Sequence, residues 1–460
     1  MAEKRDALAT GSIPALLRKM AIPGVLSQLL LLLYNMVDRI YLGRLNDGGM
    51  ALLALGLCLP ITYLFNAVAF LFGQGGAARA MIKLGAGDRE EAERIMGNSV
   101  ASITLSGLVI TLVFYLNATP IMYLLGASDV SIDAAATYMR IYSLGAVAIM
   151  GYMGFLQFVI TQGATKQAMI YVISGALCNV ILDPILIFTF HMGVAGAAIA
   201  TVLSQLLIAV CSIRFLASDK SRLQLKWRYM APKGALLAAI VSLGFSPFLM
   251  QITEAILTVV TDASAQKYGG DISALGMTLA VSLSMAIWMP SNGINQGAQA
   301  LLSYNFGSRD YDRVRQTVNT LMRYQLIFFG IMTALLELFP VVFIRIFTPD
   351  ADVIREATWM VRVNTAGFFI LPIQTVFQQI YLSTGQEKSS LAMVIIRKLV
   401  LHIPLLFILP LIMKNKVLGV VLAEPISDIV SVVVTSLYFV PGFYRMLDKR
   451  QGSFQKGASV

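Results

Sequence analysis

Apolar runs long enough to cross a membrane follow one another along almost the whole chain. A helix rises about 1.5 Å per residue, so about 20 apolar residues span the hydrocarbon core, and about twelve segments reach that length. They lie at roughly 14–43, 51–80, 93–117, 133–163, 167–190, 194–217, 233–263, 272–304, 315–341, 353–384, 389–413 and 416–445. This pattern predicts an all-α, polytopic membrane protein with twelve transmembrane helices, embedded in a lipid bilayer.

Composition supports this class and excludes several others. The chain is 57% hydrophobic and 13% charged, whereas about 25% of the residues of a soluble domain are charged. The net charge of +10 comes without a basic stripe interleaved with aromatic residues, so no nucleic-acid partner is predicted. The two histidines are far apart and the three cysteines lie in apolar runs, which argues against a metal site and against an enzyme.

The basic residues predict how the chain is oriented. Lys and Arg outside the spans concentrate in alternate loops, for example at Lys83, Arg89, Lys166 and Lys388. Basic loops stay in the cytoplasm, so we expect both termini to be cytoplasmic. The polar segment Met1–Lys19 and the long apolar run after it do not resemble a cleaved signal peptide, so that run is expected to remain as a span.

The chain repeats itself across its midpoint. The matched groups, 222 or 223 residues apart, are Gly73-Gln74-Gly75 with Asn295-Gln296-Gly297, Asp88 with Asp310, Arg140 with Arg362, Gly163 with Gly385, and Val194-Ala195-Gly196 with Val417-Leu418-Gly419. We therefore predict two six-helix lobes of the same topology, residues 1–217 and 233–445. A cytoplasmic linker, 218–232, joins them, and a cytoplasmic tail, 446–460, follows. Parallel repeats of this kind usually hold a substrate site between the halves and alternate access by rocking.

Asp38 lies inside the first apolar run, Ala21–Gly43. A carboxylate at the centre of a span costs roughly 2.5–3.5 kcal/mol, and less towards the interface, so such a residue is a candidate for function. An ion pair with Arg39 is the structural alternative, although adjacent helix residues do not share a face.

A second intramembrane acid lies in the fifth span. Asn179 and Asp183 are four residues apart and share a helix face, and Pro184 frees backbone carbonyls beside them. With Asp38 and the Thr201 hydroxyl they could form a polar pocket. Desolvation and like charge disfavour two ionised carboxylates there, so one can take up a proton; ionised, the same oxygens could hold Na⁺. An interhelical hydrogen-bond network is the structural alternative.

Several of these segments resemble the multidrug and toxic compound extrusion (MATE) transporters, most closely their MepA-like bacterial branch. The resemblance rests on Ile22-Pro23 with Tyr34-Asn35-Met36-Val37-Asp38-Arg39, on Gly73-Gln74-Gly75-Gly76, on Asn179-Val180-Ile181-Leu182-Asp183-Pro184 and on Gly193–Thr201. It implies a secondary antiporter in a bacterial inner membrane. Such a protein exports organic, often cationic or amphipathic drugs in exchange for H⁺ or Na⁺, by alternating access and without any other cofactor.

The resemblance also implies roles for individual residues. Asp38, Asp183, Asn179 and Thr201 would form the cation-coupling site. Gln157 would join them, as the longer counterpart of an asparagine that relatives often carry. Residues that would line a substrate cleft are Tyr34, Asn35, Glu254, Met285, Trp288 and Met289.

The second half has a different set of charges. Glu254 lies in the seventh span and would meet a cationic substrate or pair structurally. The tenth span carries glutamines in place of an acid, so a complete second cation site is not predicted. Arg397, Glu424 and Asp428 are expected to form a structural salt-bridge group.

Other functions were weighed against the antiporter. A flippase for lipid-linked precursors or polysaccharides, of the same superfamily, would need a cationic cavity for phosphates, whereas the intramembrane charges here are mainly acidic. The glycine cluster at 73–76 lacks the strand and the Gly-Lys-Ser/Thr of an ATP-binding loop, so an ion gradient must supply the energy. We expect a monomer.

Overall fold

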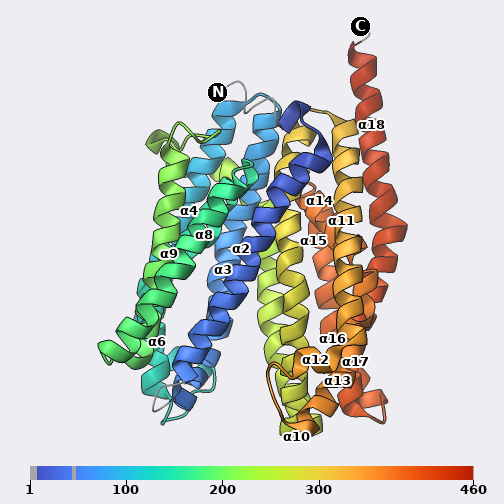
Figure 1. The fold of residues 1–460 in the computed structure, drawn as a ribbon. Coiled ribbons are helices and arrows are strands. Elements are labelled where there is room, and N and C mark those ends of the chain that lie inside the picture. The colour runs from blue at the N-terminus through green and yellow to red at the C-terminus, as the bar shows by residue number, and fades with distance from the viewer. Residues whose placement is uncertain (1–7, 44–47, 459–460) are drawn as a thin grey trace. The chain divides into compact units, whose positions relative to one another are not determined.

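The computed structural model describes residues 8–43 and 48–458 (Figure 1). The side chains of residues 35, 36, 38–40, 42, 43, 48–52 and 453–458 lie outside this description. Helices and their connecting turns make up the described residues, and no strand occurs among them. The predicted all-α class is confirmed.

The helices of the first half follow the predicted spans closely. They are α2 (Ile13–Gly43), α3 (Gly48–Gly85), α4 (Arg89–Leu116), the short α5 (Ala118–Leu124), α6 (Ile132–Leu144), α7 (Ala146–Thr161), α8 (Thr165–Pro184) with the π-helical η1 (Ile185–Thr189), and α9 (Gly193–Ala217). The short 3₁₀ helix η2 (Trp227–Tyr229) lies in the linker.

The second half begins with the 74-residue helix α10 (Gly234–Gly307). The others are α11 (Tyr311–Leu338), the short α12 (Pro340–Ile344), α13 (Ala351–Thr365) with the 3₁₀ helix η3 (Ala366–Phe369), α14 (Pro372–Ser383), α15 (Glu387–Val394), the π-helical η4 (Ile395–His402), α16 (Ile403–Ile412), α17 (Lys416–Val434), the π-helical η5 (Thr435–Phe439), and α18 (Val440–Ala458). Helix α18 runs well into the segment 446–460 that was expected to be a tail.

Twelve spans are accounted for when bends and breaks are considered. Among the described residues, nine helices are long and apolar enough to cross a membrane, or eleven if each of two bent pairs is one span. Helix α10 would be about 111 Å long if it were continuous, far more than one bilayer. It is interrupted at Gly270, whose φ of 69° and ψ of −167° are not helical, so it supplies the seventh and eighth spans. The predicted twelve-helix class is confirmed.

Two predicted spans are bent rather than straight. The fourth, 133–163, bends by 54° between α6 and α7, at Gly145. The tenth, 353–384, bends by 55° between η3 and α14. Pro372 begins α14, and because proline has no backbone N–H it cannot continue the preceding helix. A hydropathy window measures only length and apolarity, so it could not show either bend.

The contacts divide the chain into two compact units. One is Ile22–Ala255, and the other combines Met1–Ala21 with Ile256–Val460. Both boundaries therefore fall inside long helices, α2 and α10, and the linker 218–232 belongs to the first unit.

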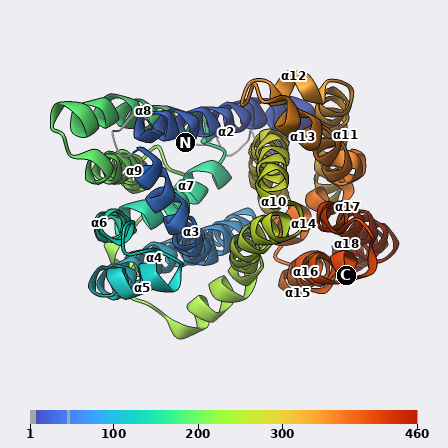
Figure 2. The same ribbon diagram turned by 90° about the horizontal axis from the view of Figure 1, so that it is seen from below.

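In the first unit, α7 contacts α3, α4 and α9 (Figure 2). A Cβ on Gly73 would lie 2.5 Å from Cα of Gly154, and one on Gly75 would lie 2.6 Å from Cα of Gly244. The glycine cluster of α3 thus allows α7 and α10 to approach its backbone, as small residues do between membrane helices.

The internal repeat is visible in local geometry. Asp88 caps α4 by accepting a hydrogen bond from N of Glu91, and Asp310 caps α11 by accepting one from N of Arg313. Gly163 and Gly385 both have positive φ, 81° and 71°. With the matching bends in the fourth and tenth spans, these features show that the two halves share one helical plan.

Candidate functional site

The residues expected to bind the coupling cation lie on three helices of the unit Ile22–Ala255. Asn179 and Asp183, on α8, are completely buried, and Thr201, on α9, is nearly so. Gln157, on α7, is also buried. Helices α7, α8 and α9 all contact one another. The tertiary structure therefore gathers, in one three-helix group, residues from three separate spans.

Asn179 and Asp183 are joined directly. Nδ2 of Asn179 donates a hydrogen bond of 3.4 Å to Oδ1 of Asp183, one helical turn away. Pro184 ends α8, and the backbone then widens into the π-helical turn η1. Such turns are rare and are frequently found at functional sites.

Helix α9 approaches this turn closely because of Gly196. A Cβ at Gly196 would lie 2.8 Å from the carbonyl carbon of Leu186, so no larger residue fits without a shift. Gly196 lies five residues before Thr201 on α9. The close approach of α9 to η1 thus fixes where the Thr201 segment passes the end of α8.

Two amide oxygens of this group have no donor among the described residues. Oδ1 of Asn179 and Oε1 of Gln157 are buried and accept no described hydrogen bond. A buried polar atom without a partner is unfavourable and calls for an explanation, such as a bound ion or water. With the Asp183 carboxylate and the Thr201 hydroxyl, the group offers oxygen donors, which suit a hard cation or a shared proton.

Asp38 and Asn35 lie in the helical backbone of α2, but their side chains are outside the described part of the structure. The position of the Asp38 carboxylate relative to Asp183 therefore stays a prediction. Tyr34, on the same helix, is half-buried.

A second buried charge group lies in the unit that contains Ile256–Val460. Nε of Arg397 is 2.8 Å from Oδ1 of Asp428, and both side chains are buried, at 3% and 0% exposure. Arg397 belongs to the π-helical segment η4, and Asp428 lies on α17 one turn after the half-buried Glu424. The structure thus brings together Arg397 and Asp428, which the sequence analysis expected to pair.

Trp288 takes part in this second group. The guanidinium of Arg397 lies 4.9 Å from the centroid of the Trp288 ring. The same ring makes edge-to-face contacts with Phe329 at 6.1 Å and Phe368 at 6.0 Å. Trp288 is half-buried and contacts the Arg397 guanidinium within an aromatic cluster, and its expected place in a substrate cleft stays a prediction.

The sequence analysis did not single out two further buried residues of η4. Lys398 is 3% exposed and His402 is 6% exposed, and Nδ1 of His402 has no hydrogen-bond partner among the described residues. The available signal was the Arg397-Lys398 dipeptide inside an apolar run, which is costly unless the protein interior compensates it.

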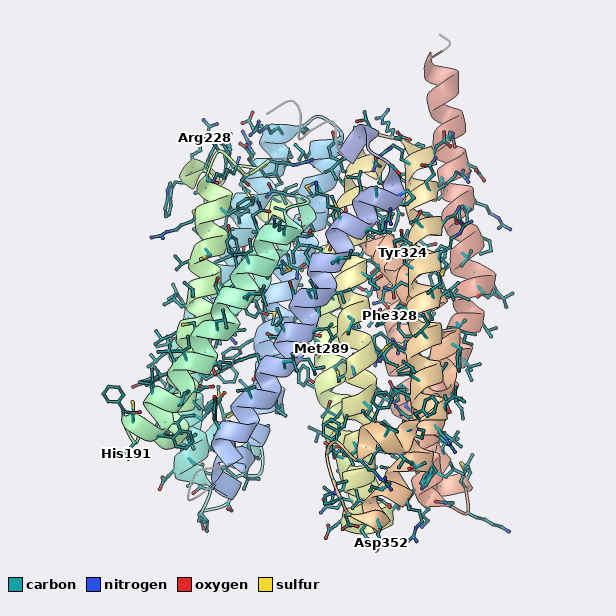
Figure 3. All side chains as sticks on the ribbon, viewed as in Figure 1. His191, Arg228, Met289, Tyr324, Phe328 and Asp352 are labelled. Carbon is teal, nitrogen blue, oxygen red and sulfur yellow. The ribbon has the colours of Figure 1, made fainter. Side chains whose placement is uncertain are left out.

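The remaining candidates are half-buried on α10. Glu254 belongs to the unit Ile22–Ala255, whereas Met285 and Met289 belong to the other unit. Met289 is labelled in Figure 3. Their expected contact with a substrate stays a prediction.

Known proteins show the same pattern of two halves. The MatE family profile matches the chain twice, over residues 23–185 and 247–408, together more than half of its length. The chain is 27% identical over 391 residues to the multidrug export protein MepA of Staphylococcus saprophyticus, covering 85% of each chain. It is 26% identical over 392 residues to MepA of Staphylococcus aureus strain MW2, again with 85% of each chain covered.

Solved structures have a similar fold. One described as MATE in complex with MaD3S gives a TM-score of 0.88 at 22% identity, covering 97% of this chain and 98% of that one. An outward-facing conformation of a multidrug resistance MATE family transporter also gives 0.88 at 22% identity, covering 96% and 98%. These findings indicate a membrane transporter and not an enzyme. The chain belongs to the MATE family.

Proposed function

We propose that this transporter exports organic, often cationic compounds across a bacterial cytoplasmic membrane in exchange for H⁺ or Na⁺. Similarity to proteins named multidrug export protein supports the direction and the substrate class. The observation that carries the exchange is the buried Asn179–Asp183 pair, in which Oδ1 of Asn179 accepts no described hydrogen bond.

The Asn179–Asp183 pair can respond to H⁺ or Na⁺ because binding of either cation changes the net charge of the pair. An ionised Asp183 beside a neutral amide gives the pair a net negative charge in an apolar bundle, which is costly. A proton on the carboxyl, or Na⁺ held by the oxygens of Asp183, Asn179 and Thr201, removes that charge. Binding and release of the cation would therefore favour different arrangements of α8 and α9, and this difference is what couples an ion to a conformational change.

The gradient supplies enough energy for export. Moving one elementary charge across 100 mV yields about 2.3 kcal/mol, which corresponds to roughly a 50-fold substrate gradient at 25 °C. Both termini would be cytoplasmic, as the excess of basic residues in alternate loops predicts.

The flippase alternative is less well supported by the buried charges. In the second unit the buried guanidinium of Arg397 is paired with Asp428 at 2.8 Å, so its charge is already compensated. A substrate phosphate would have to compete with that carboxylate for Arg397.

The test is efflux of ethidium from proteoliposomes under a proton gradient or a sodium gradient, each imposed alone. Efflux driven by only one gradient identifies the coupling ion. Efflux that continues at equal rate without any gradient contradicts antiport. If neither gradient moves ethidium or other organic cations, and lipid-linked sugars are translocated instead, the flippase assignment replaces the antiporter.

A further inference from the structure

The linker between the two halves of the sequence is fixed to the start of α4. Glu93, on α4, is 1% exposed. Its carboxylate accepts hydrogen bonds from Nζ of Lys226 at 2.5 Å and from the backbone N of Gln224 at 3.3 Å, both in the linker. Arg89 adds a third bond at 3.0 Å from Nε. A buried carboxylate with three donors holds this part of the linker in place.

Asn98, five residues further along α4, fixes the end of the linker. Its Nδ2 donates to the carbonyl of Tyr229 at 2.9 Å, and its Oδ1 accepts from N of Lys233 at 2.7 Å. A Cβ on Gly97 would lie 2.6 Å from the Tyr229 carbonyl oxygen. Residues 229–233 therefore lie directly on α4.

A recess of about 220 Å³ lies where the linker meets α4. The residues that line it and matter here are Glu90, Arg94, Asn98, Arg228, Tyr229 and Lys233. Three of these carry a positive charge and one a negative charge. The Glu90 carboxylate accepts hydrogen bonds from Nη2 of Arg94 at 2.8 Å and from the Tyr229 hydroxyl at 3.3 Å. Its charge is therefore compensated inside the recess, and a surplus of positive charge remains.

Donors in the recess have unused capacity. Nε of Arg94 is buried and has no acceptor among the described residues. Nη2 of Arg228 donates to the Tyr229 hydroxyl at 2.6 Å, and the guanidinium lies 4.6 Å from the centroid of that ring, which orients it. Neither Arg228 nor Lys233 takes part in an ion pair in the described structure. An anion with several acceptor oxygens would satisfy all three cations.

An exposed tryptophan indicates where that anion comes from. Trp227 directly precedes Arg228 in the 3₁₀ helix η2 and is 87% exposed. Arg228 lies at one end of its unit and His191 at the other (Figure 3). Tryptophan is enriched at membrane interfaces, where its ring reaches the headgroup level. Basic pockets between helices at a membrane surface bind the headgroups of anionic lipids.

We propose that the recess formed by Arg94, Arg228 and Lys233 is a binding site for a phosphate group, presented by an anionic phospholipid next to Trp227. The bound phosphate would bridge α4 and the linker and add to the contacts that Glu93 and Asn98 make. The proposal is independent of the coupling ion and of the exported compound.

The test is a titration of the purified, delipidated full-length protein with phosphatidylglycerol, followed by native mass spectrometry. The recess variant Arg228→Gln/Lys233→Gln keeps both Arg94 and the contacts of Glu93. Each basic side chain near an anionic surface contributes about fivefold in affinity, so removing two should weaken the strongest phosphatidylglycerol site by about 30-fold. Phosphatidylcholine should bind equally weakly to all variants.

Lys166→Gln/Lys220→Gln is the matched control, because it removes two exposed positive charges from the same unit outside the recess. We expect less than a twofold change for it. Equal loss in both variants, or no loss in the recess variant, would overturn the proposal. An arm with inorganic phosphate, compared with chloride at equal ionic strength to control for screening, distinguishes the source. If phosphate alone binds the wild type and not the recess variant while phosphatidylglycerol does not compete, the ligand is a soluble phosphate and the lipid assignment is wrong.

Discussion

The two buried acids, Asp183 in the first unit and Asp428 in the second, differ in the hydrogen-bond donors that the structure describes for them. Asp183 accepts a hydrogen bond from a neutral amide on its own helix at 3.4 Å. Asp428 accepts one at 2.8 Å from a guanidinium on a neighbouring segment. An ionised Asn179–Asp183 pair carries a net charge, whereas the Arg397–Asp428 pair is neutral. Among the described contacts, the second group thus contains a cation of the chain, Arg397, whereas the described contact of Asp183 is with an amide, which fits our proposal of an exchangeable cation.

The common helical plan makes this difference informative. Gly196 and Gly419 each allow their helix to pass close to the backbone of the preceding span. A Cβ added at either glycine would lie 2.8 Å from a backbone carbon of that span. The offset of 223 residues that relates them also relates Thr201 to Glu424 and Gln205 to Asp428. The repeat therefore preserved how the helices pack and changed which residues carry charge.

Removing the buried guanidinium of Arg397 should have the largest effect on stability. Arg397→Met leaves the buried Asp428 without its guanidinium, and breaking a buried ion pair typically costs about 3–5 kcal/mol. We expect a large fall in the yield of folded protein and in its thermal unfolding midpoint in detergent.

The double variant Arg397→Met/Asp428→Leu is the control for that loss. Apolar side chains of similar volume often replace a buried ion pair without cost, so most of the stability should return. A double variant as unstable as the single one would contradict a purely electrostatic cause. Normal folding with no transport in either variant would assign the pair to the transport mechanism.

Removing the Asp183 carboxylate, the proposed site of the exchanged cation, should affect transport and leave folding intact. Asp183→Asn keeps the shape and polarity of the side chain but can neither ionise nor take up the coupling proton. The gradient-driven part of export, about 50-fold at 100 mV, should be lost in proteoliposomes, and drug resistance with it. We expect the same of Asp38→Asn.

Asp271→Asn serves as the comparison, because Asp271 is exposed at the break in α10. It should transport like the wild type. Retained resistance in both Asp183→Asn and Asp38→Asn would remove the coupling assignment.

The shared packing of the two halves predicts equal effects of equal substitutions. Gly196→Ala and Gly419→Ala each place a methyl group against backbone, and overpacking of this kind costs typically about 1–3 kcal/mol. Unfolding midpoints of the two variants should fall by similar amounts.

Gly56→Ala and Gly330→Ala test whether the loss comes from packing. Their added Cβ would meet no atom within 4 Å, and alanine favours a helix over glycine by about 0.8–1.0 kcal/mol. Both should be neutral or slightly stabilising. A large fall in the unfolding midpoint of Gly196→Ala, without one for Gly419→Ala, would show that the two halves are not packed equally tightly at these positions.

The smallest effect is expected at the helix caps. Asp88→Ala and Asp310→Ala each remove a side-chain acceptor at a helix start, typically worth about 1 kcal/mol. Asp88→Asn and Asp310→Asn retain an acceptor and should lose much less. Unequal losses at the two caps, measured as unfolding midpoints, would weaken the structural equivalence of α4 and α11.

Much of the site could be predicted because its residues lie close together in sequence. Asn179 and Asp183 are one helical turn apart, so the sequence alone places them on one face. Arg397 and Asp428 lie on different spans, and their pairing was predicted because a buried charge needs an opposite one. The contact between Arg397 and Trp288 joins residues more than one hundred positions apart, and no local pattern indicated it.

The sequence by itself determined the membrane class, the number of spans and the internal repeat. Transfer of an apolar segment into a bilayer is a sum over about 20 neighbouring residues, so it can be evaluated locally. Only the tertiary structure decided the bends of the fourth and tenth spans, the aromatic cover of the Arg397–Asp428 pair and the docking of the linker on α4. The docking of the linker depends on contacts of Glu93 with Lys226 and of Asn98 with Tyr229, and the aromatic cover on that of Arg397 with Trp288, all of which span more than one hundred residues. Such contacts form only when several helices have packed, because each partner must first be brought to the other by the fold.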